Sequence, residues 1–291
     1  MRKITWVRNI KRGETMTIKI VVDSSIDLPD ELIDQTGVEI VPLTVSFGAD
    51  HYLDRIEITP EEFQKRMSRE KELPKTAQPA PGKFLEVFDK LGQMGHQVLC
   101  LCLSSALSGS YNSARLAKSM TTTEVEVVDT LSGSAGLGIL SYLSTQWTHL
   151  GKSLQDITEE VQKYAENLTV YALLDTVENA VKGGRLSPIK GAIASLLNLK
   201  IICEVKQGKV DVIEKVRGTQ KAYERLATLV NEKVQGRPVP MIGIAHVDNK
   251  KGAGILQEMV AQNYSDALFF QTAMGATIGT YAGKGGLVLA F

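Results

Sequence analysis

Short apolar runs alternate with amphipathic segments over most of the chain. The runs at residues 18–23, 97–103 and 125–129 have the length of strands and carry few charges, which favours buried strands. Helical patterns lie between them, the longest at residues 134–150. Because strands and helices alternate, residues 16–167 predict an N-terminal α/β domain with a mostly parallel sheet.

Capping residues and prolines refine this first half. Asp27 to Pro29 predict the start of a short helix that ends at Gly37, and Thr59 with Pro60 predicts another helix start. Residues 39–47 predict a strand in which Pro42 indicates an edge or a bend. Residues 73–81 are rich in proline and predict a loop before the next helix.

The pattern changes after a charged helix that Ser153 caps, which we expect to connect two halves. Two strand-like runs flank Gln207 and Gly208 and predict a β-hairpin. Residues 188–197 predict an apolar helix. Further strands are expected at residues 169–174, 241–247, 267–271 and 286–290, with helices starting at Thr219 and Lys250. Residues 168–291 therefore predict a second α/β domain whose mixed or antiparallel sheet is flanked by helices.

Composition narrows the class of protein. The 33 Lys and Arg residues balance the 33 Asp and Glu residues, so no net charge favours nucleic acid as a partner. No apolar run reaches the roughly 18 residues of a transmembrane helix. Residues 1–15 are basic without an apolar block, and we expect a disordered tail or a mis-assigned leader before a start at Met16. The three cysteines, Cys100, Cys102 and Cys203, have neither the spacing of a metal site nor that of a redox motif. They predict reduced core residues in a cytoplasmic protein.

The most informative segment is the junction after the strand at residues 97–103. Ser104, Ser105 and Ser108 precede a helix that begins near Gly109. A helix start presents unpaired N–H groups and a positive dipole end, and serines add donors, so the junction suits a carboxylate or a phosphate. The alternative that these serines only cap the helix stays open.

Two functions from other classes compete with anion binding. Ser105 with His246 as base would make a serine hydrolase or an acyltransferase, but the chain has no Gly-x-Ser-x-Gly elbow. A sensor of a small anion is the other alternative. The sequence contains no phosphate-binding Gly-x-x-x-x-Gly-Lys-Ser/Thr loop and no metal-site spacing.

Three further loops carry polar residues suited to an anion. Prolines around Thr76 fix its loop. Arg185 follows two glycines and is placed either to hold a carboxylate as a fork or to form a structural salt bridge or helix cap. The segment from Gly279 to Gly283 predicts a turn of small residues near the final strand.

Together these segments resemble the DegV family, in order and over nearly the whole chain. The resemblance is carried by Asp23-Ser24-Ser25-Ile26-Asp27-Leu28-Pro29, Lys75-Thr76-Ala77-Gln78-Pro79, Leu103-Ser104-Ser105-Ala106-Leu107-Ser108-Gly109-Ser110-Tyr111, Gly183-Gly184-Arg185-Leu186-Ser187 and Ile278-Gly279-Thr280-Tyr281-Ala282-Gly283. It implies a non-catalytic protein that buries a long-chain fatty acid between two α/β domains. It further implies that the protein presents the carboxylate to a separate ATP-dependent fatty acid kinase, which forms acyl phosphate for phospholipid synthesis, with no cofactor or metal.

The resemblance also assigns roles to residues. Thr76 and Ser105 match the family's carboxylate-binding positions, and Arg185 matches an arginine near the domain interface. Tyr281 stands where the family usually has a histidine that reaches the carboxylate; a phenol still donates a hydrogen bond and is neutral at working pH. Supporting positions behind these residues are expected at Asp23, Ser24, Ser104, Gly279 and Thr280.

The acyl tail needs an apolar tunnel, for which the predicted helix at residues 188–197 is the best candidate. We expect its lining to include Ile189, Ile193, Leu196, Phe270, Met274 and Ile278. The alternative for each is ordinary core packing. Delivery of a lipid is also compatible with transient contact with a membrane surface.

Overall fold

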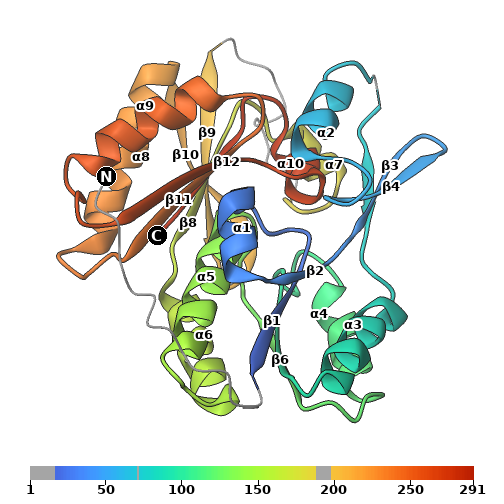
Figure 1. Ribbon diagram of the computed structural model, residues 1–291. Coiled ribbons are helices and arrows are strands. Elements are labelled where there is room, and N and C mark those ends of the chain that lie inside the picture. Colours follow the sequence, from blue (N-terminus) through green and yellow to red (C-terminus); the bar gives the residue numbers. More distant parts are fainter. Residues whose placement is uncertain (1–16, 71, 188–197) are drawn as a thin grey trace.

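The computed structural model describes residues 17–70, 72–187 and 198–291, and within them the chain forms three sheets (Figure 1). The basic segment at residues 1–15 and the predicted apolar helix at residues 188–197 lie outside the described residues. The next described strand begins at Leu199.

The first sheet is parallel, with the strand order β2-β1-β6-β7. Its strands are β1 (Ile18–Asp23), β2 (Glu39–Val41), β6 (Gln97–Cys102) and β7 (Val125–Asp129). Helices α3 (Pro81–Gln93) and α4 (Ser110–Lys118) cover one face, and α5 (Ala135–His149) and α6 (Leu154–Asn167) cover the other (Figure 1). Because both faces are buried, the strands read as continuous apolar runs, which is why their positions could be predicted.

The second sheet has six strands in the order β10-β9-β8-β13-β11-β12. They are β8 (Val170–Leu174), β9 (Leu199–Lys206), β10 (Lys209–Arg217), β11 (Met241–His246), β12 (Leu268–Ala273) and β13 (Leu287–Ala290). Only β11 and β12 pair in parallel, among the described strands of this sheet. Helices α8 (Thr219–Val234) and α9 (Lys250–Ala261) cover one face. The predicted class, a parallel α/β half followed by a mixed α/β half, is confirmed.

Helix α5 lies between the two large sheets. It contacts β1 and β6 on one side and β11 and β13 on the other, and one cluster of buried side chains extends across both sheets. Of its 15 residues, nine are buried, including Leu137, Ile139 and Leu140. The strands of each large sheet come from one half of the sequence, but the halves share this core.

The third sheet is small and antiparallel, and it holds part of the candidate site. Its order is β4-β3-β5, with β3 (Thr44–Phe47), β4 (Asp50–Leu53) and β5 (Lys75–Ala77). The expected strand at residues 39–47 is two strands, β2 and β3, in different sheets on either side of Pro42. The expected loop at residues 73–81 contains β5, because Thr76 pairs with Val45 of β3.

The helix boundaries follow local signals in several places. Helix α1 (Asp30–Thr36) ends at Gly37, and α2 (Pro60–Met67) begins with the capping box that Thr59 forms with Glu62. The hairpin of β9 and β10 turns at Gln207 and Gly208, which both have positive φ. These predictions are confirmed.

Two further helices are short: α7 (Glu178–Lys182), which ends at Gly183, and α10 (Ala276–Ala282). The expectation of a turn of small residues at Gly279–Gly283 is wrong, since most of this segment belongs to α10. Small residues allow α10 to pack closely: a Cβ at Gly279 would lie 2.7 Å from Phe63 of α2. In Figure 1, α2, α7 and α10 lie together beside β3 and β4.

Close packing between α5 and the loop after β1 gives a first prediction. A Cβ at Gly138 would lie 2.7 Å from the backbone oxygen of Asp27, so Gly138→Ala should lower the free energy of unfolding by about 1–3 kcal/mol. Gly254→Ala in α9 is the matched control, because its Cβ would meet only Gln271 Nε2 at 4.0 Å and alanine favours a helix by about 0.5–1 kcal/mol. Urea unfolding checks both. An unchanged stability of the first variant would show that the contact relaxes freely.

The end of β11 gives a second prediction, on pH. His246 is buried, and burial lowers its pKa from the usual 6.5, with Lys250 acting in the same direction. The unfolded chain therefore binds more protons below pH 6.5, and the free energy of unfolding should fall as the pH falls through this value. His246→Asn should reduce that dependence in urea unfolding between about pH 7.5 and about pH 5.5. Equal dependence in both proteins would contradict this assignment.

Candidate functional site

A cavity of about 360 Å³ lies between the two halves of the chain. Its walls are mainly apolar and come from the second and third sheets, from α7 and α10, and from the loops after β2, β6 and β7. The apolar lining residues are Leu43, Ala77, Leu103, Leu107, Val170, Ala172, Leu174, Ala180, Val205, Val210, Ile278, Ala282 and Val288. A concave, mainly apolar space with a few polar groups is the usual form of a small-molecule site.

Three predicted residues meet at this cavity. Thr76 Oγ1 on β5 and Tyr281 Oη on α10 form a hydrogen bond of 2.6 Å. The guanidinium carbon of Arg185 lies 4.7 Å from the centre of the Tyr281 ring. All three side chains line the cavity and are half-buried. The fold thus joins residues that are up to 205 positions apart.

The orientation of Arg185 is fixed by backbone oxygens. Nε donates to the carbonyl of Leu107 at 3.1 Å, and Nη1 donates to the carbonyl of Gly183 at 2.8 Å. Among the residues that the structure describes, Nη2 has no hydrogen-bond partner, so this end of the guanidinium retains donors for an anion. Among the described residues Arg185 forms no salt bridge, but its bond to Gly183, the C-cap residue of α7, is a helix-cap contact, so Arg185 caps α7 and keeps Nη2 for an anion.

Ser105 is not among the residues that line the cavity, unlike Thr76, Arg185 and Tyr281. Its side chain is exposed, and its backbone N–H donates to the Asp129 carboxylate at 3.2 and 3.3 Å. The physical reason is a turn in which the N–H groups of Leu107 and Ser108 both donate to the carbonyl of Ser104. This turn delays the helix, and α4 begins only at Ser110.

Ser108 is the serine of this segment that lines the cavity, together with Gln78 from the loop after β5. Its Oγ lies 3.0 Å from Ser110 Oγ and accepts from the backbone N–H of Ser110 at 3.2 Å. Gln78 Nε2 donates to Ser113 Oγ of α4 at 3.1 Å. Neither residue was predicted as a binding residue.

Asp23 and Ser104 are buried behind the cavity and shape its wall. Asp23 accepts hydrogen bonds from both the backbone and the side chain of Ser25 and from the backbone N–H of Leu103 at 2.8 Å. Burial raises the pKa of Asp23, while these hydrogen bonds oppose the rise. Ser104 Oγ donates to the carbonyl of Gly208 at 2.8 Å and so attaches the β9–β10 hairpin to the first half.

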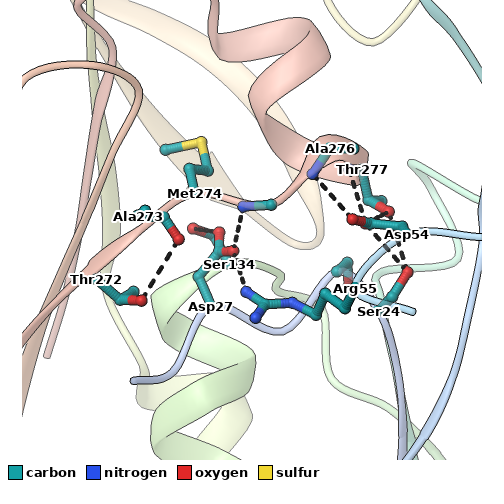
Figure 2. Close-up of polar contacts among 12 residues, drawn as sticks. Ser24, Asp27, Asp54, Arg55, Ser134, Thr272, Ala273, Met274, Ala276 and Thr277 are labelled. Atoms are coloured by element: carbon teal, nitrogen blue, oxygen red, sulfur yellow. Dashed lines mark hydrogen bonds and ion pairs between the residues drawn. The ribbon is translucent and has the colours of Figure 1, made fainter. Parts of the chain in front are cut away.

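Ser24, Gly279 and Thr280 support the helix that carries Tyr281. Ser24 Oγ donates to Asp54 at 3.2 Å, next to the start of α10 (Figure 2). Within α10, Thr280 Oγ1 donates to the carbonyl of Ala276 at 2.8 Å, and Gly279 packs against Phe63. The resemblance implies supporting roles for these three residues, but no sequence signal indicates Asp54, to which Ser24 donates.

The expected tunnel residues have different positions. Ile278 lines the cavity, whereas Phe270 and Met274 are buried in the core and are not among the lining residues. Phe270 packs against Gly243 of the neighbouring strand β11. Ile189, Ile193 and Leu196 lie outside the described residues.

The pair required by the hydrolase hypothesis is not assembled. His246 Nδ1 accepts from the backbone N–H of Asn249 at 3.4 Å, and the His246 carbonyl accepts from Gln64 of α2 at 3.1 Å. The bonds of Ser105 to Asp129 are made by its backbone N–H, and within the described residues no hydrogen bond joins the Ser105 hydroxyl to His246.

Two other kinds of site are absent from the described residues. No group of three or more His, Cys, Asp and Glu side chains there is arranged to hold a metal ion. No helix there combines the length and the apolar character that a membrane crossing requires. Cys100, Cys102 and Cys203 are buried free thiols, as expected.

Comparison with known proteins places this geometry in a family. Residues 17–291 match the model of the DegV family, which is described as uncharacterised. A DegV domain-containing protein of Clostridium acetobutylicum is 31% identical over 267 residues, which are 91% of this chain and 95% of the relative.

Two solved structures are similar over nearly their whole length. One is a DegV family protein from Thermus thermophilus described by its fatty acid binding, with 30% identity, a TM-score of 0.87, and coverage of 95% of this chain and 99% of that chain. The other is DegV from Bacillus subtilis, described as a fatty acid binding protein, with 28% identity, a TM-score of 0.85 and the same coverage. On its sequence and its fold, the chain belongs to the DegV family.

Proposed function

We propose that this protein binds a long-chain fatty acid in the cavity between its halves and presents the carboxylate to a separate ATP-dependent fatty acid kinase. The observation that carries the proposal is an apolar cavity whose polar residues include the contiguous group of Thr76, Tyr281 and Arg185. The fatty acid binding named for the two DegV structures supports it. In this proposal the chain needs no cofactor and performs no chemistry itself.

The walls favour an acyl chain over a small anion. Each buried methylene contributes about 0.8 kcal/mol, so a tail of sixteen carbons supplies about 12 kcal/mol before the cost of ordering it. The polar groups then only have to compensate the carboxylate for its lost hydration. Hydroxyl groups of Thr76, Tyr281 and Ser108 with Nη2 of Arg185 are sufficient donors for this purpose.

Presentation to a kinase requires a carboxylate near the surface. Thr76, Arg185 and Tyr281 are half-buried, and Gln78 beside them is exposed, so this end of the cavity is close to solvent. A carboxylate held there would be within reach of a partner subunit, whereas the acyl chain would stay covered. The buried free thiols support a reducing, cytoplasmic setting for this exchange.

Native mass spectrometry of the purified protein, followed by solvent extraction, tests the proposal. We expect a co-purified mass of a long-chain fatty acid that is released on denaturation, because the buried tail dissociates slowly. Addition of a fatty acid kinase subunit and ATP should convert the bound acid to acyl phosphate. A bare polypeptide that also fails to take up added fatty acid would refute fatty acid binding.

The head-group assignment gives a prediction that separates the two serines. Thr76→Val and Ser108→Ala should each weaken hexadecanoate binding about fivefold to tenfold, because each removes one hydrogen-bond donor to the carboxylate. Ser105→Ala is the matched control and should bind as the unsubstituted chain does. Titration calorimetry on delipidated protein measures all three. A loss confined to Ser105→Ala would restore the assignment that the resemblance implies.

A further inference from the structure

Helix α10, which carries Tyr281, has no N-terminal cap from its own segment. Its N-cap residue is Gly275, which has no side chain to accept a hydrogen bond, and the helix has only seven residues. An isolated helix of this length is unstable, and its first N–H groups need acceptors from elsewhere. The position of Tyr281 therefore depends on whatever residue supplies those acceptors.

The acceptors come from Asp54, in the other half of the chain. Its Oδ1 accepts from the backbone N–H of Ala276 at 3.1 Å, and its Oδ2 accepts from the backbone N–H of Thr277 at 3.0 Å (Figure 2). Hydroxyl groups of Thr277 and Ser24 also donate to Oδ2. Asp54 is fully buried, and a negative charge at this end of a helix is favourable.

A second buried carboxylate fixes the residue just before the helix. Asp27 Oδ1 accepts from the backbone N–H of Gly275 at 2.8 Å and from Arg55 Nη2 at 2.9 Å, and its Oδ2 accepts from Ser134 Oγ at 2.6 Å (Figure 2). Burial raises the pKa of Asp27, while Arg55 opposes the rise. Asp27 and Arg55 thus hold the approach to α10, and Asp54 holds its first turn.

The small sheet links Asp54 to the partner of Tyr281. Asp54 directly follows β4, and its N–H donates to the carbonyl of Leu43 at 2.9 Å. Thr76 lies on β5, and both β4 and β5 pair with β3. The small sheet and the residue that follows it therefore contact both ends of α10. Asp54 accepts hydrogen bonds from its first turn, and Thr76 bonds to Tyr281 in its last turn.

We infer that Asp54 is a positioning residue that caps α10 from the opposite half of the chain and thereby places the Tyr281 hydroxyl at Thr76. Asp54 is not among the residues that line the cavity, and its carboxylate bonds only to α10 and to Ser24 among the described residues, so it acts through these groups. The inference rests on the proposed function, because the placed hydroxyl matters only if the cavity takes a carboxylate. Asparagine is a poor substitute: its amide nitrogen cannot accept from the N–H groups of Ala276 and Thr277 together with its oxygen.

A double-mutant cycle tests the inference with hexadecanoate as the probe. Asp54→Asn should weaken binding about tenfold in the unsubstituted chain but less than about twofold in a Tyr281→Phe background, where no hydroxyl remains to be placed. Ser153→Ala, which removes the cap of α6, is the control and should lower the unfolding midpoint without changing affinity. Equal losses in both backgrounds, or no loss in either, would overturn the inference.

A second variant keeps the test decisive if Asp54→Asn alone does not fold. Gly275 has φ −68° and ψ 172°, and a Cβ there would lie no closer than 3.4 Å to its nearest neighbour, so Gly275→Ser gives α10 a local cap. Asp54→Asn combined with Gly275→Ser should regain folding and hexadecanoate affinity. A folded combination that binds weakly in both Tyr281 backgrounds would overturn the inference. Failure of the unsubstituted chain to bind hexadecanoate would overturn the proposed function and the inference with it.

Discussion

Helix α5 is buried against both large sheets, and this double burial determines how the two halves of the chain lie relative to each other. Its apolar side chains contact the parallel sheet on one side and the mixed sheet on the other. Gly133 and Ser134, which precede the helix, line the cavity. The cavity therefore lies at the N-terminal end of α5, beyond which the helix does not fill the space between the sheets.

The polar groups around the start of α5 are mainly hydroxyl groups and buried carboxylates. Asp23, Asp27 and Asp54 are fully buried, and each accepts several hydrogen bonds from loops that meet at the cavity. A buried carboxylate is tolerated only when it is well bonded, so each fixes the loops around it. The same hydrogen bonds that stabilise these carboxylates thus determine the shape of the polar end of the cavity.

The regular elements could be predicted where the sequence pattern reflects local chemistry. The strands β1, β6 and β7 are apolar because both sheet faces are covered, and α2 and α6 carry their own capping boxes. Thr76, Arg185 and Tyr281 could be predicted from motifs and were found together. In contrast, β5 and α10 form through contacts with distant residues, and no local signal predicts them. The resemblance implies Ser105, whereas Ser108 lines the cavity, because the turn closed by the Ser104 carbonyl delays the start of α4 and no residue type predicts this turn.

The place of β13 in the second sheet has a consequence for biosynthesis. Although β13 follows every other described strand in the sequence, it lies inside the sheet, between β8 and β11. Val288 of this strand lines the cavity, and Tyr281 precedes it by a few residues. Until β13 is synthesised, the second sheet is divided into the parts β10-β9-β8 and β11-β12, and the cavity lacks one of its walls. Under the proposed function, the acyl chain would therefore enter only after β13 has joined the two parts of the sheet.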